Sequence, residues 1–311
     1  MSRELFDVAI IGAGPAGLSA ALVLGRARRH VVVCDSGQYR NAPSRGMHGY
    51  LTREGMAPAE FLRVARAEVF VCETVELVQQ EVVDVRRIAD GFELRVEGIA
   101  PIRARKLLLA TGVVDDLPPV EGAEALFGRG VYLCPYCDGW EVRDQPLAVY
   151  GRGDHKGASF ALELTLWSSH IVLCTDGPGD LSAEYVARLA KAGIPVREGK
   201  IARLEGDGDR LTRIVFADGT SLACQALFFN TGRRQRSDFA RRLGCAGYHE
   251  EGCDLTDKTG KTDVPGLYVI GDASRDTLQV IVAAAEGSQA AIAVNTELLR
   301  DDDVLGAPPK K

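Results

Sequence analysis

Gly12-Ala13-Gly14-Pro15-Ala16-Gly17 is the stretch that decides the fold of this 311-residue chain. The apolar run before it, residues 5–11, is broken only by Asp7 and predicts a buried parallel strand. Residues 18–28 are rich in Ala and Leu and predict a helix, and the β-branched run over residues 30–34 predicts a second strand. This strand–turn–helix–strand order is typical of a doubly wound α/β fold.

Each glycine of the turn meets a separate need of a dinucleotide site. Gly12 allows the tight turn, Gly14 lets the backbone approach a pyrophosphate, and Gly17 lets the helix pack near the strand. The amino terminus of the helix then faces the phosphates. Asp35 ends the next strand, where its carboxylate can accept hydrogen bonds from a ribose. The expected ligand is therefore a dinucleotide, and the alternative is a purely structural turn.

A second unit of the same kind starts near the middle of the chain. Residues 147–150 and 170–174 predict strands on either side of a helix, and Gly151 and Gly153 lie in the turn that precedes this helix. Further strand-like segments follow, and the chain then reaches a last apolar helix over residues 279–299. The sequence thus contains an internal repeat of a nucleotide-binding unit.

We therefore predict an α/β protein with two Rossmann-like nucleotide-binding domains of three layers (ββα), the second inserted into the first. Residues 1–116 and 244–311 are expected to form the first domain, which ends in a polar tail. Residues 117–243 are expected to form the second domain. Residues 41–56 are rich in Gly, Pro and Arg and predict a loop over the site of the first domain.

The composition suits a globular protein of roughly two domains, with 46% hydrophobic and 26% charged residues. The net charge is −6 and no Lys/Arg-rich run stands out, so nucleic acid is not an expected partner. No apolar run reaches the roughly 18 residues that a membrane span needs, and the pattern of a signal peptide is absent. We therefore expect no membrane partner and a cytoplasmic location.

Cys134-Pro135-Tyr136-Cys137-Asp138 lies between the two Gly-rich turns and also carries a redox pattern. Thiols at this spacing can close a small disulfide, and the pKa of one of them is often lowered. The other cysteines are scattered singly, and neither a second Cys pair nor a His pair completes a zinc site, so no metal is expected. The order of the motifs predicts a flavoprotein that passes electrons through a dithiol, and an inert structural pair is the alternative.

Four motifs give the chain a resemblance to a known family. The first Gly turn, Ala110-Thr111-Gly112, the segment over residues 134–139 and Gly271-Asp272-Ala273 occur in the order seen in low-molecular-weight thioredoxin reductases and their relatives. The resemblance extends from Phe6 to about residue 299 and implies that the first domain binds FAD. The cofactor contacts that we expect are Gly12, Gly14, Pro15, Ala16, Gly17, Asp35, Ser36, Asn41, His48, Thr111, Gly112, Gly271, Asp272, Gln279 and Val280.

Some of these contacts have a specific meaning in the family. By resemblance, Asp272 would bond the flavin ribityl chain, and Gln279 and Val280 would lie near the isoalloxazine. Familiar members carry Arg-Gln where this chain has Gln279-Val280. His48 lies on the loop predicted over the flavin, and a surface or structural histidine is its alternative interpretation.

The resemblance also implies roles for the dithiol. Cys137 would face the flavin, and Cys134 would exchange with the disulfide of a partner. Asp138 would donate and accept the proton if partial burial raises its pKa. The implied partners are thioredoxin or a small-molecule disulfide or dithiol, and the implied assembly is a homodimer.

The second Gly turn departs from the family pattern. Lys156 stands where the third glycine is expected, and its long side chain would crowd the helix–strand contact or the pyrophosphate. The next strand ends at Asp176, which would repel a 2′-phosphate, and lacks the basic His-Arg-Arg cluster of NADPH-dependent relatives. We therefore expect a loss of efficient NADPH use. The second domain either binds NADH weakly or has a vestigial site, with a different electron donor such as ferredoxin.

Three functions remain open from the sequence. The leading one is an FAD-dependent disulfide oxidoreductase that acts on an external disulfide such as thioredoxin. The second reverses the electron flow, so that the chain oxidises a small dithiol and passes electrons to oxygen. The third is a non-catalytic flavin redox sensor, which Asp138 disfavours because a sensor needs no proton donor.

Overall fold

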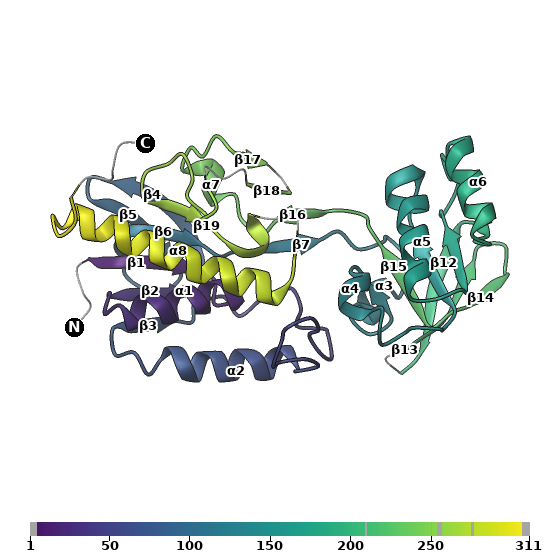
Figure 1. Ribbon diagram of the computed structural model, residues 1–311, viewed down its shortest axis with the longest axis horizontal. Helices are drawn as coiled ribbons and strands as arrows, with labels where there is room; N and C mark the ends of the chain where they lie inside the picture. Colours follow the sequence, from purple (N-terminus) through teal and green to yellow (C-terminus); the bar gives the residue numbers. More distant parts are fainter. Residues whose placement is uncertain (1–4, 209, 250, 254–256, 275–276, 307–311) are drawn as a thin grey trace. The chain divides into compact units, whose positions relative to one another are not determined.

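The structure is a computed structural model that describes residues 5–208, 210–249, 251–253, 257–274 and 277–306. It forms two compact units (Figure 1). Unit 1 comprises Met1–Ala42, Ala59–Val114 and Arg233–Lys311, and unit 2 comprises Pro43–Pro58 and Asp115–Gly232. Unit 2 is thus inserted into unit 1, and the α/β fold with two Rossmann-like sheets that the sequence predicted is confirmed.

Unit 1 is built on a seven-stranded sheet of order β3-β2-β1-β6-β5-β4, with β19 paired to β6. Strands β3, β2, β1, β6 and β19 are parallel, and the β4–β5 hairpin is joined to them in antiparallel fashion. The strands are β1 (Phe6–Ile11), β2 (Val31–Cys34), β3 (Val75–Val78), β4 (Val82–Ile88), β5 (Gly91–Val96), β6 (Ile102–Leu109) and β19 (Leu267–Val269). Strands β2 and β19 and the last three residues of β6 are apolar and buried because both faces of this part of the sheet are covered.

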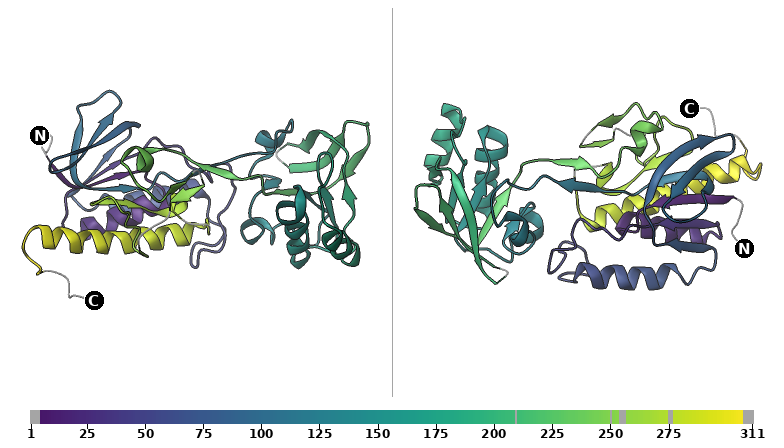
Figure 2. Two further views of the ribbon diagram at one scale, coloured as in Figure 1. Left: turned by 90° about the horizontal axis from the view of Figure 1, so that it is seen from above. Right: turned by 180° about the vertical axis from the view of Figure 1, so that it is seen from behind.

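Two long helices, α1 (Pro15–Arg26) and α8 (Val280–Asp301), lie side by side on one face of this sheet (Figures 1 and 2). Their small residues allow a close approach, since a Cβ added to Gly287 would lie 2.1 Å from the carbonyl oxygen of Ala16. Helix α1 begins three residues before the sequence prediction because Pro15 suits the first helical position. The other helices of unit 1 are α2 (Pro58–Val69), α7 (Phe239–Arg242) and the 3₁₀ turn η3 (Gly271–Ala273).

Unit 2 has three layers, as the sequence predicted. A five-stranded parallel sheet of order β11-β10-β9-β15-β8 packs on one face against the antiparallel sheet β12-β13-β14, and on the other against helices. The strands are β8 (Val131–Tyr132), β9 (Leu147–Tyr150), β10 (Ile171–Cys174), β11 (Val196–Arg197), β12 (Ile201–Asp207), β13 (Arg210–Phe216), β14 (Ser221–Ala223) and β15 (Ala226–Phe229). The helices are α3 (Ala123–Leu126), α4 (Pro135–Asp138), the π-helical turn η1 (Asp154–Ser159), α5 (Phe160–Glu163), the 3₁₀ turn η2 (Leu164–Leu166) and α6 (Ala183–Lys191).

The unit boundaries differ from the expected ones in two places. Unit 2 ends at Gly232, whereas the sequence placed the end of the inserted domain at residue 243. Helix α7 belongs to unit 1 because Arg242 forms an ion pair with Asp84 of β4. The second difference is the loop Pro43–Pro58, which groups with unit 2 although the sequence assigned it to the first domain.

Two short strand pairs and an isolated bridge lie outside these sheets. Strand β7 (Val113–Asp115) pairs with β16 (Arg233–Gln235), and β17 (Tyr248–His249) pairs with β18 (Gly252–Cys253). A bridge between Met47 and Met56 closes the tip of the loop Pro43–Pro58. Of the polar tail predicted from residue 301, positions 307–311 lie outside the described residues. Within the part of the chain that the structure describes, no helix has the length and apolar character of a bilayer span.

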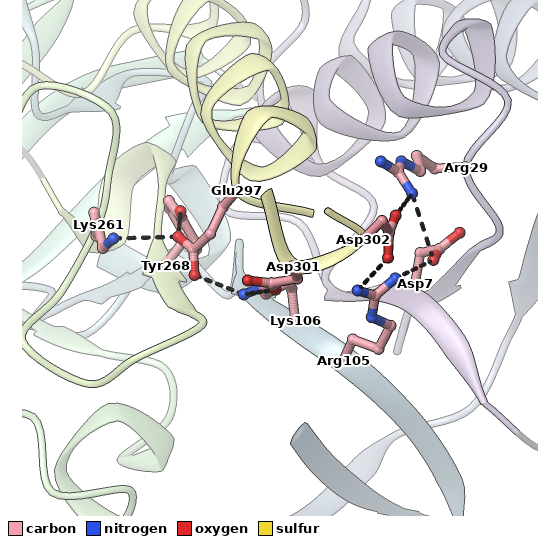
Figure 3. A network of polar contacts seen from close by, with 9 residues as sticks. All are labelled: Asp7, Arg29, Arg105, Lys106, Lys261, Tyr268, Glu297, Asp301 and Asp302. Carbon is pink, nitrogen blue, oxygen red and sulfur yellow. Dashed lines mark hydrogen bonds and ion pairs between the residues drawn. The ribbon is translucent and has the colours of Figure 1, made fainter. Parts of the chain in front are cut away.

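The carboxyl-terminal part of α8 is tied to unit 1 by ion pairs (Figure 3). Glu297 Oε1 lies 2.6 Å from Lys106 Nζ, and Glu297 Oε2 accepts a hydrogen bond of 2.6 Å from the Tyr268 hydroxyl. Burial raises the pKa of Glu297, but the hydrogen bonds from Lys106 and Tyr268 outweigh it and bring the pKa down to about 2. A neighbouring cluster joins Asp302 to Arg29 and Arg105.

We expect Glu297→Gln to destabilise unit 1 by roughly 3 kcal/mol at pH 7, because a depressed carboxyl pKa is a measure of stabilisation of the charged form. The stabilisation is complete above the usual pKa of 4.5 and is lost as the pH falls through about 2, so the deficit of the variant shrinks over that window. Urea unfolding followed by circular dichroism at pH 7 and at acidic pH measures both effects.

Asp301→Asn is the matched control for this prediction. Its carboxylate also contacts Lys106 Nζ, at 2.8 Å, but the side chain is 43% exposed. We expect a loss below about 1 kcal/mol, as for other exposed ion pairs. Equal losses in the two variants would contradict the importance assigned to Glu297.

Candidate redox site and nucleotide-binding turns

The two cysteines of the Cys-x-x-Cys motif are joined in a disulfide at the start of α4 in unit 2, as their spacing predicted. Cys134 is the N-cap residue, and its Sγ accepts a hydrogen bond of 3.1 Å from the Cys137 amide. Pro135 follows at the first helical position, where its fixed φ starts the turn. One helical turn therefore holds both sulfurs together, with their Cα atoms 5.2 Å apart.

Aromatic residues lie within and directly after the segment that carries this disulfide. The Tyr136 ring packs edge-on against Trp167 with 5.3 Å between the ring centroids, and the Arg143 guanidinium lies 4.0 Å from the centroid of Trp140. Tyr136 and Trp140 nevertheless remain 63% and 65% exposed. Large exposed aromatic residues are unusual on a protein surface and are frequent in contacts with partners.

Asp138 follows Cys137 directly and has an unusual pKa. Burial raises the pKa of its carboxyl to about 7, while His48 lowers it and Glu141 raises it further. A carboxyl that titrates near neutral pH can both donate and accept a proton. The condition that the sequence analysis attached to this residue, a pKa raised by burial, is therefore met.

His48 belongs to unit 2 in the structure and lies beside the dithiol segment. Its Nδ1 lies 2.6 Å from Glu54 Oε1 and 3.6 Å from Glu141 Oε1. The sequence analysis expected His48 on a loop over the flavin, and its contact with the cofactor stays a prediction. The structure adds a different neighbourhood, beside Glu141, that no local sequence pattern indicated.

The first Gly turn has the shape of a phosphate cradle. A Cβ added to Gly12 would lie 2.3 Å from the carbonyl oxygen of Ala110, and one added to Gly17 would lie 1.9 Å from the carbonyl oxygen of Gly12. By contrast, no heavy atom of the described residues lies within 4 Å of a Cβ added to Gly14. The turn is closed toward the protein and open at the position where a pyrophosphate approaches, so its residues fit a dinucleotide.

The acidic residue after β2 is anchored to this turn. Asp35 is buried, and its Oδ1 accepts a hydrogen bond of 3.1 Å from the Ala13 amide. Its Oδ2 bonds the Tyr39 hydroxyl and lies 2.7 Å from Nη2 of Arg66 in α2. The carboxylate therefore lies beside the Gly turn, as a ribose contact requires.

The segment after β19 lies against the same turn. A Cβ added to Gly271 would lie 2.9 Å from Cβ of Ala16, so Gly271 packs on the first turn of α1. Asp272 forms an ion pair of 3.2 Å with Arg40. Because the parallel strands β1, β2, β6 and β19 end at one edge of the sheet, the residues that follow them gather there: Gly12, Gly14, Pro15, Ala16, Gly17, Asp35, Ser36, Thr111, Gly112, Gly271 and Asp272.

The other expected contacts follow from neighbouring elements. Gln279 is the N-cap residue of α8 and Val280 its first residue, and Asn41 lies in a turn beyond β2. The sequence analysis missed Tyr39, Arg40 and Arg66, which bond the two carboxylates. Tyr39 and Arg40 lie within five residues of Asp35, which is the only signal that the sequence offered for them.

The second Gly turn contradicts one expectation. Lys156 does not crowd the helix–strand contact, because it is exposed and Gly157 occupies the buried position. A Cβ added to Gly157 would lie 3.0 Å from the carbonyl oxygen of Gly151. The physical reason is the π-helical turn η1, whose wider register moves the point of close contact one residue along the chain.

Polar groups around this second turn are engaged within the protein. Asp176 is buried, and its carboxylate bonds Lys200 Nζ at 2.6 Å and the Ile201 amide at 2.7 Å. Arg152 Nε donates to the carbonyl oxygen of Thr175 at 2.7 Å, so the guanidinium lies over the end of β10. The carboxylate that was expected to repel a 2′-phosphate thus serves as a structural acceptor.

The loop after β10 also closes over the turn. The Gly153 amide donates a hydrogen bond of 2.8 Å to the carbonyl oxygen of Gly179. Asp154 Oδ1 accepts a hydrogen bond of 2.9 Å from the Ser182 amide. Backbone donors of this kind bind phosphate in open nucleotide turns. In this turn the Gly153 amide already donates to the carbonyl oxygen of Gly179, whereas the first turn is open at Gly14.

An open dinucleotide cradle in one unit and a redox disulfide in an inserted second unit define a class of protein, the two-domain disulfide oxidoreductases. The sequence profile of the pyridine nucleotide-disulphide oxidoreductases matches residues 6–287. The chain belongs to this family and, within it, to the low-molecular-weight thioredoxin reductases, which are FAD-dependent disulfide oxidoreductases.

Individual relatives agree over the full length. The chain is 30% identical to thioredoxin reductase tcpT of Claviceps purpurea over 316 residues, which cover 96% of each chain. The crystal structure of HlmI is 38% identical, with a TM-score of 0.91 over 97% of this chain and 96% of that one. An oxidoreductase from Agrobacterium tumefaciens is 33% identical, with a TM-score of 0.87 over 96% of this chain and 99% of that one.

The register of the second turn leads to a direct test. We expect Gly157→Val to destabilise unit 2 by about 2 kcal/mol or more, because its side chain would meet backbone atoms of the strand–helix turn. Lys156→Ala should change stability by no more than about 0.5 kcal/mol. Both tryptophans of the chain, Trp140 and Trp167, lie in unit 2, so tryptophan fluorescence during urea unfolding reports on this unit. A larger loss for the Lys156 variant would refute the shifted register.

Proposed function

We propose that the chain binds FAD in unit 1 and transfers electrons between the flavin, the Cys134–Cys137 pair and an external disulfide such as that of thioredoxin. The observation that carries the proposal is the disulfide of α4 followed by Asp138, whose pKa lies near neutrality. Family membership supports the cofactor and the type of reaction. The open Gly turn of unit 1 supports the place of the cofactor.

Several elements of unit 1 would hold the FAD. The pyrophosphate would bind at the amino terminus of α1, where Gly14 leaves room for it. Asp35 would hold the ribose, and Asp272 would lie along the ribityl chain. Once bound, the flavin supplies a carrier for two electrons. The residues of unit 1 that we assign to this site are Gly12, Gly14, Pro15, Ala16, Gly17, Asp35, Ser36, Asn41, Thr111, Gly112, Gly271, Asp272, Gln279 and Val280. We also keep His48, on the loop Pro43–Pro58 that groups with unit 2, as a proposed cofactor contact.

The dithiol would perform the exchange in two steps. The Cys134 thiolate attacks one sulfur of the partner disulfide, the partner S–S bond breaks, and the leaving thiolate takes the proton of Asp138. Cys137 then attacks the Cys134 sulfur, and the mixed disulfide with the partner breaks as the internal disulfide closes. The proton that the Cys137 thiol loses passes to the second leaving thiolate, so the partner is released as a dithiol. Bound FAD would supply the two electrons that return this disulfide to the dithiol.

The surroundings of the dithiol support an external partner. Tyr136 and Trp140 expose large aromatic surfaces next to Cys134 and Cys137, where an incoming disulfide must approach. Cys34, Cys72, Cys174 and Cys224 are not in disulfides, which supports a reducing compartment, and we propose a cytoplasmic location on this basis. A homodimer is proposed from family membership alone.

The contacts of the second turn support an electron donor other than NADPH. Gly153 bonds the carbonyl oxygen of Gly179, Asp176 bonds Lys200 and Ile201, and no basic cluster follows β10 to hold a 2′-phosphate. Weak use of NADH and use of a protein donor such as ferredoxin are both consistent with these contacts.

The same closed turn favours one alternative function. A protein without a nicotinamide step could oxidise a small dithiol at Cys134 and Cys137 and pass both electrons to oxygen. This reaction would produce peroxide in the presence of a dithiol alone, and the protein would show no activity toward oxidised thioredoxin.

Variants of the dithiol test the assigned roles. We expect Cys134→Ser to lower thioredoxin reduction by at least about 100-fold, because the thiol that attacks the partner is lost. Cys137→Ser should accumulate a mixed disulfide with the partner, since no thiol remains to resolve it. Mass spectrometry of the intact protein detects this mixed disulfide. Cys72→Ser is the control, and it should keep both thioredoxin reduction and the release of the partner. If Cys134→Ser retained thioredoxin reduction, Cys134 would not be the thiol that attacks the partner disulfide.

Anaerobic titration identifies the electron donor. The flavin absorbance of the purified holoprotein is followed while NADPH, NADH, reduced ferredoxin or reduced thioredoxin is added. We expect little bleaching with NADPH, because the second turn is closed and has no partner for the 2′-phosphate. Rapid bleaching by NADPH would contradict this interpretation. A protein that takes up no flavin would end the proposal as a whole.

A further inference from the structure

Glu286 of α8 is a buried acidic residue of unit 1, with 9% of its surface exposed. Its Oε2 accepts a hydrogen bond of 2.8 Å from the Gly271 amide and lies 3.1 Å from the Ser274 hydroxyl. Burial of a carboxylate costs free energy unless donors of the protein replace the lost water. Both donors come from the two ends of one short turn, so the carboxylate is bonded to that turn rather than to the sheet.

This turn, η3, depends on contacts from outside for its shape. It has three residues, and its own closing hydrogen bond runs from the Ser274 amide to the Gly271 carbonyl oxygen at 2.9 Å. Gly271 has a φ of +70°, in the left-handed region, where its amide turns away from the regular course of β19. Glu286 accepts from this amide and thereby fixes the first residue of the turn.

Helix packing fixes the place of Glu286 in turn. The next residue, Gly287, is the point of close approach to α1, since an added Cβ would lie 2.1 Å from the Ala16 carbonyl oxygen. Gly271 rests on the same residue, because a Cβ added to it would lie 2.9 Å from Cβ of Ala16. The helix and the turn are therefore both held against Ala16, and Glu286 joins them by a hydrogen bond.

Asp272 is the middle residue of this turn and lies in sequence between the two donors that contact Glu286. Its side chain is 20% exposed, and its carboxylate forms an ion pair of 3.2 Å with Arg40. The two carboxylates thus differ in their surroundings. Asp272 is open enough to accept a hydrogen bond from a ligand, whereas Glu286 is enclosed and bonds the backbone of the turn.

We propose that Glu286 is a positioning residue for the flavin half of the cofactor: it fixes the turn η3 and so holds Asp272 in place for the ribityl chain. The inference rests on the proposed binding of FAD in unit 1 and deepens it. Glu286 itself does not touch the cofactor. The adenosine half is held by other residues, at Asp35 and the first Gly turn, so loss of Glu286 weakens the binding of the flavin half selectively.

The first test compares two ligands on the full-length protein freed of its flavin. ADP carries the adenosine and both phosphates of FAD but lacks the ribityl chain and the flavin ring. We expect Glu286→Gln to weaken FAD binding about 10-fold and ADP binding less than about twofold, because a neutral amide replaces the charged acceptor. Isothermal titration calorimetry measures both Kd values. An unchanged Kd for FAD, or equal losses for the two ligands, would overturn the proposal.

Glu297→Gln is the matched control for a general loss of stability. Glu297 is another carboxylate of α8, and its partners Lys106 and Tyr268 lie outside the turn η3. This variant is expected to destabilise unit 1, so it shows what loosening alone does to the two ligands. We expect it to leave the ratio of the FAD and ADP affinities unchanged. A change of this ratio as large as that in Glu286→Gln would reject the specific role of Glu286.

The second test asks whether Glu286 acts through Asp272. We expect Asp272→Asn to weaken FAD binding about 10-fold, and the addition of Glu286→Gln to weaken it less than about twofold further. The reason is that a positioning residue has little effect once the group that it positions is lost. Losses that multiply in the double variant would mean that the two residues act independently, and the positioning role would then be wrong.

Ser274→Ala keeps the proposal testable even if Glu286→Gln does not fold. It removes the hydroxyl beside Glu286 Oε2 and leaves the bond from the Gly271 amide. We expect FAD binding to weaken about threefold with ADP binding unchanged, and an unchanged FAD affinity would contradict the proposal. If instead the wild-type protein takes up no FAD, the proposed function itself fails, so the two failures are distinguishable.

Discussion

The contact between the backbone of the first strand–helix turn and the helix that follows it constrains all of unit 1. Gly17 lies so close to Gly12 that any side chain there would overlap a carbonyl oxygen, with only 1.9 Å between them. This contact presses α1 onto the sheet, and Gly287 then lets α8 approach α1 to a similar distance. The same turn stays open at Gly14, where a pyrophosphate can approach. The close contact at Gly17 therefore contributes both to the packing of α1 on the sheet and to the shape of the phosphate site.

Unit 2 repeats the strand–turn–helix arrangement with a different outcome. A Cβ added to Gly151 would lie 2.1 Å from the carbonyl oxygen of Lys156, and one added to Gly157 would lie 3.0 Å from the carbonyl oxygen of Gly151. A π-helical turn replaces the regular start of the helix. The loop after β10 bonds Gly153, and Arg152 covers the end of the strand. The Gly153 amide, a backbone donor of the kind that binds phosphate in an open turn, here forms a hydrogen bond within the protein. The two copies of one architecture thus differ in which backbone donors are engaged within the protein.

The sequence predicted the features that depend on local spacing. The parallel strands, the glycine turns and the Cys134–Cys137 disulfide are set by neighbouring residues. The insertion of one domain into the other was predicted from the repeated strand–turn–helix unit. The position of Gly157 was missed because it depends on the register of a π-helical turn, which a consensus spacing hides. The place of His48 was missed for another reason: its partner Glu141 lies far along the chain, and neither residue is part of a recognisable motif.

The balance of forces on Asp138 explains why a surrounding of mixed charge suits a proton donor. Burial is the main cause of its raised pKa, while His48 and Glu141 act with opposite signs and partly offset each other. The access of water therefore governs the protonation of this carboxyl more than any single neighbour.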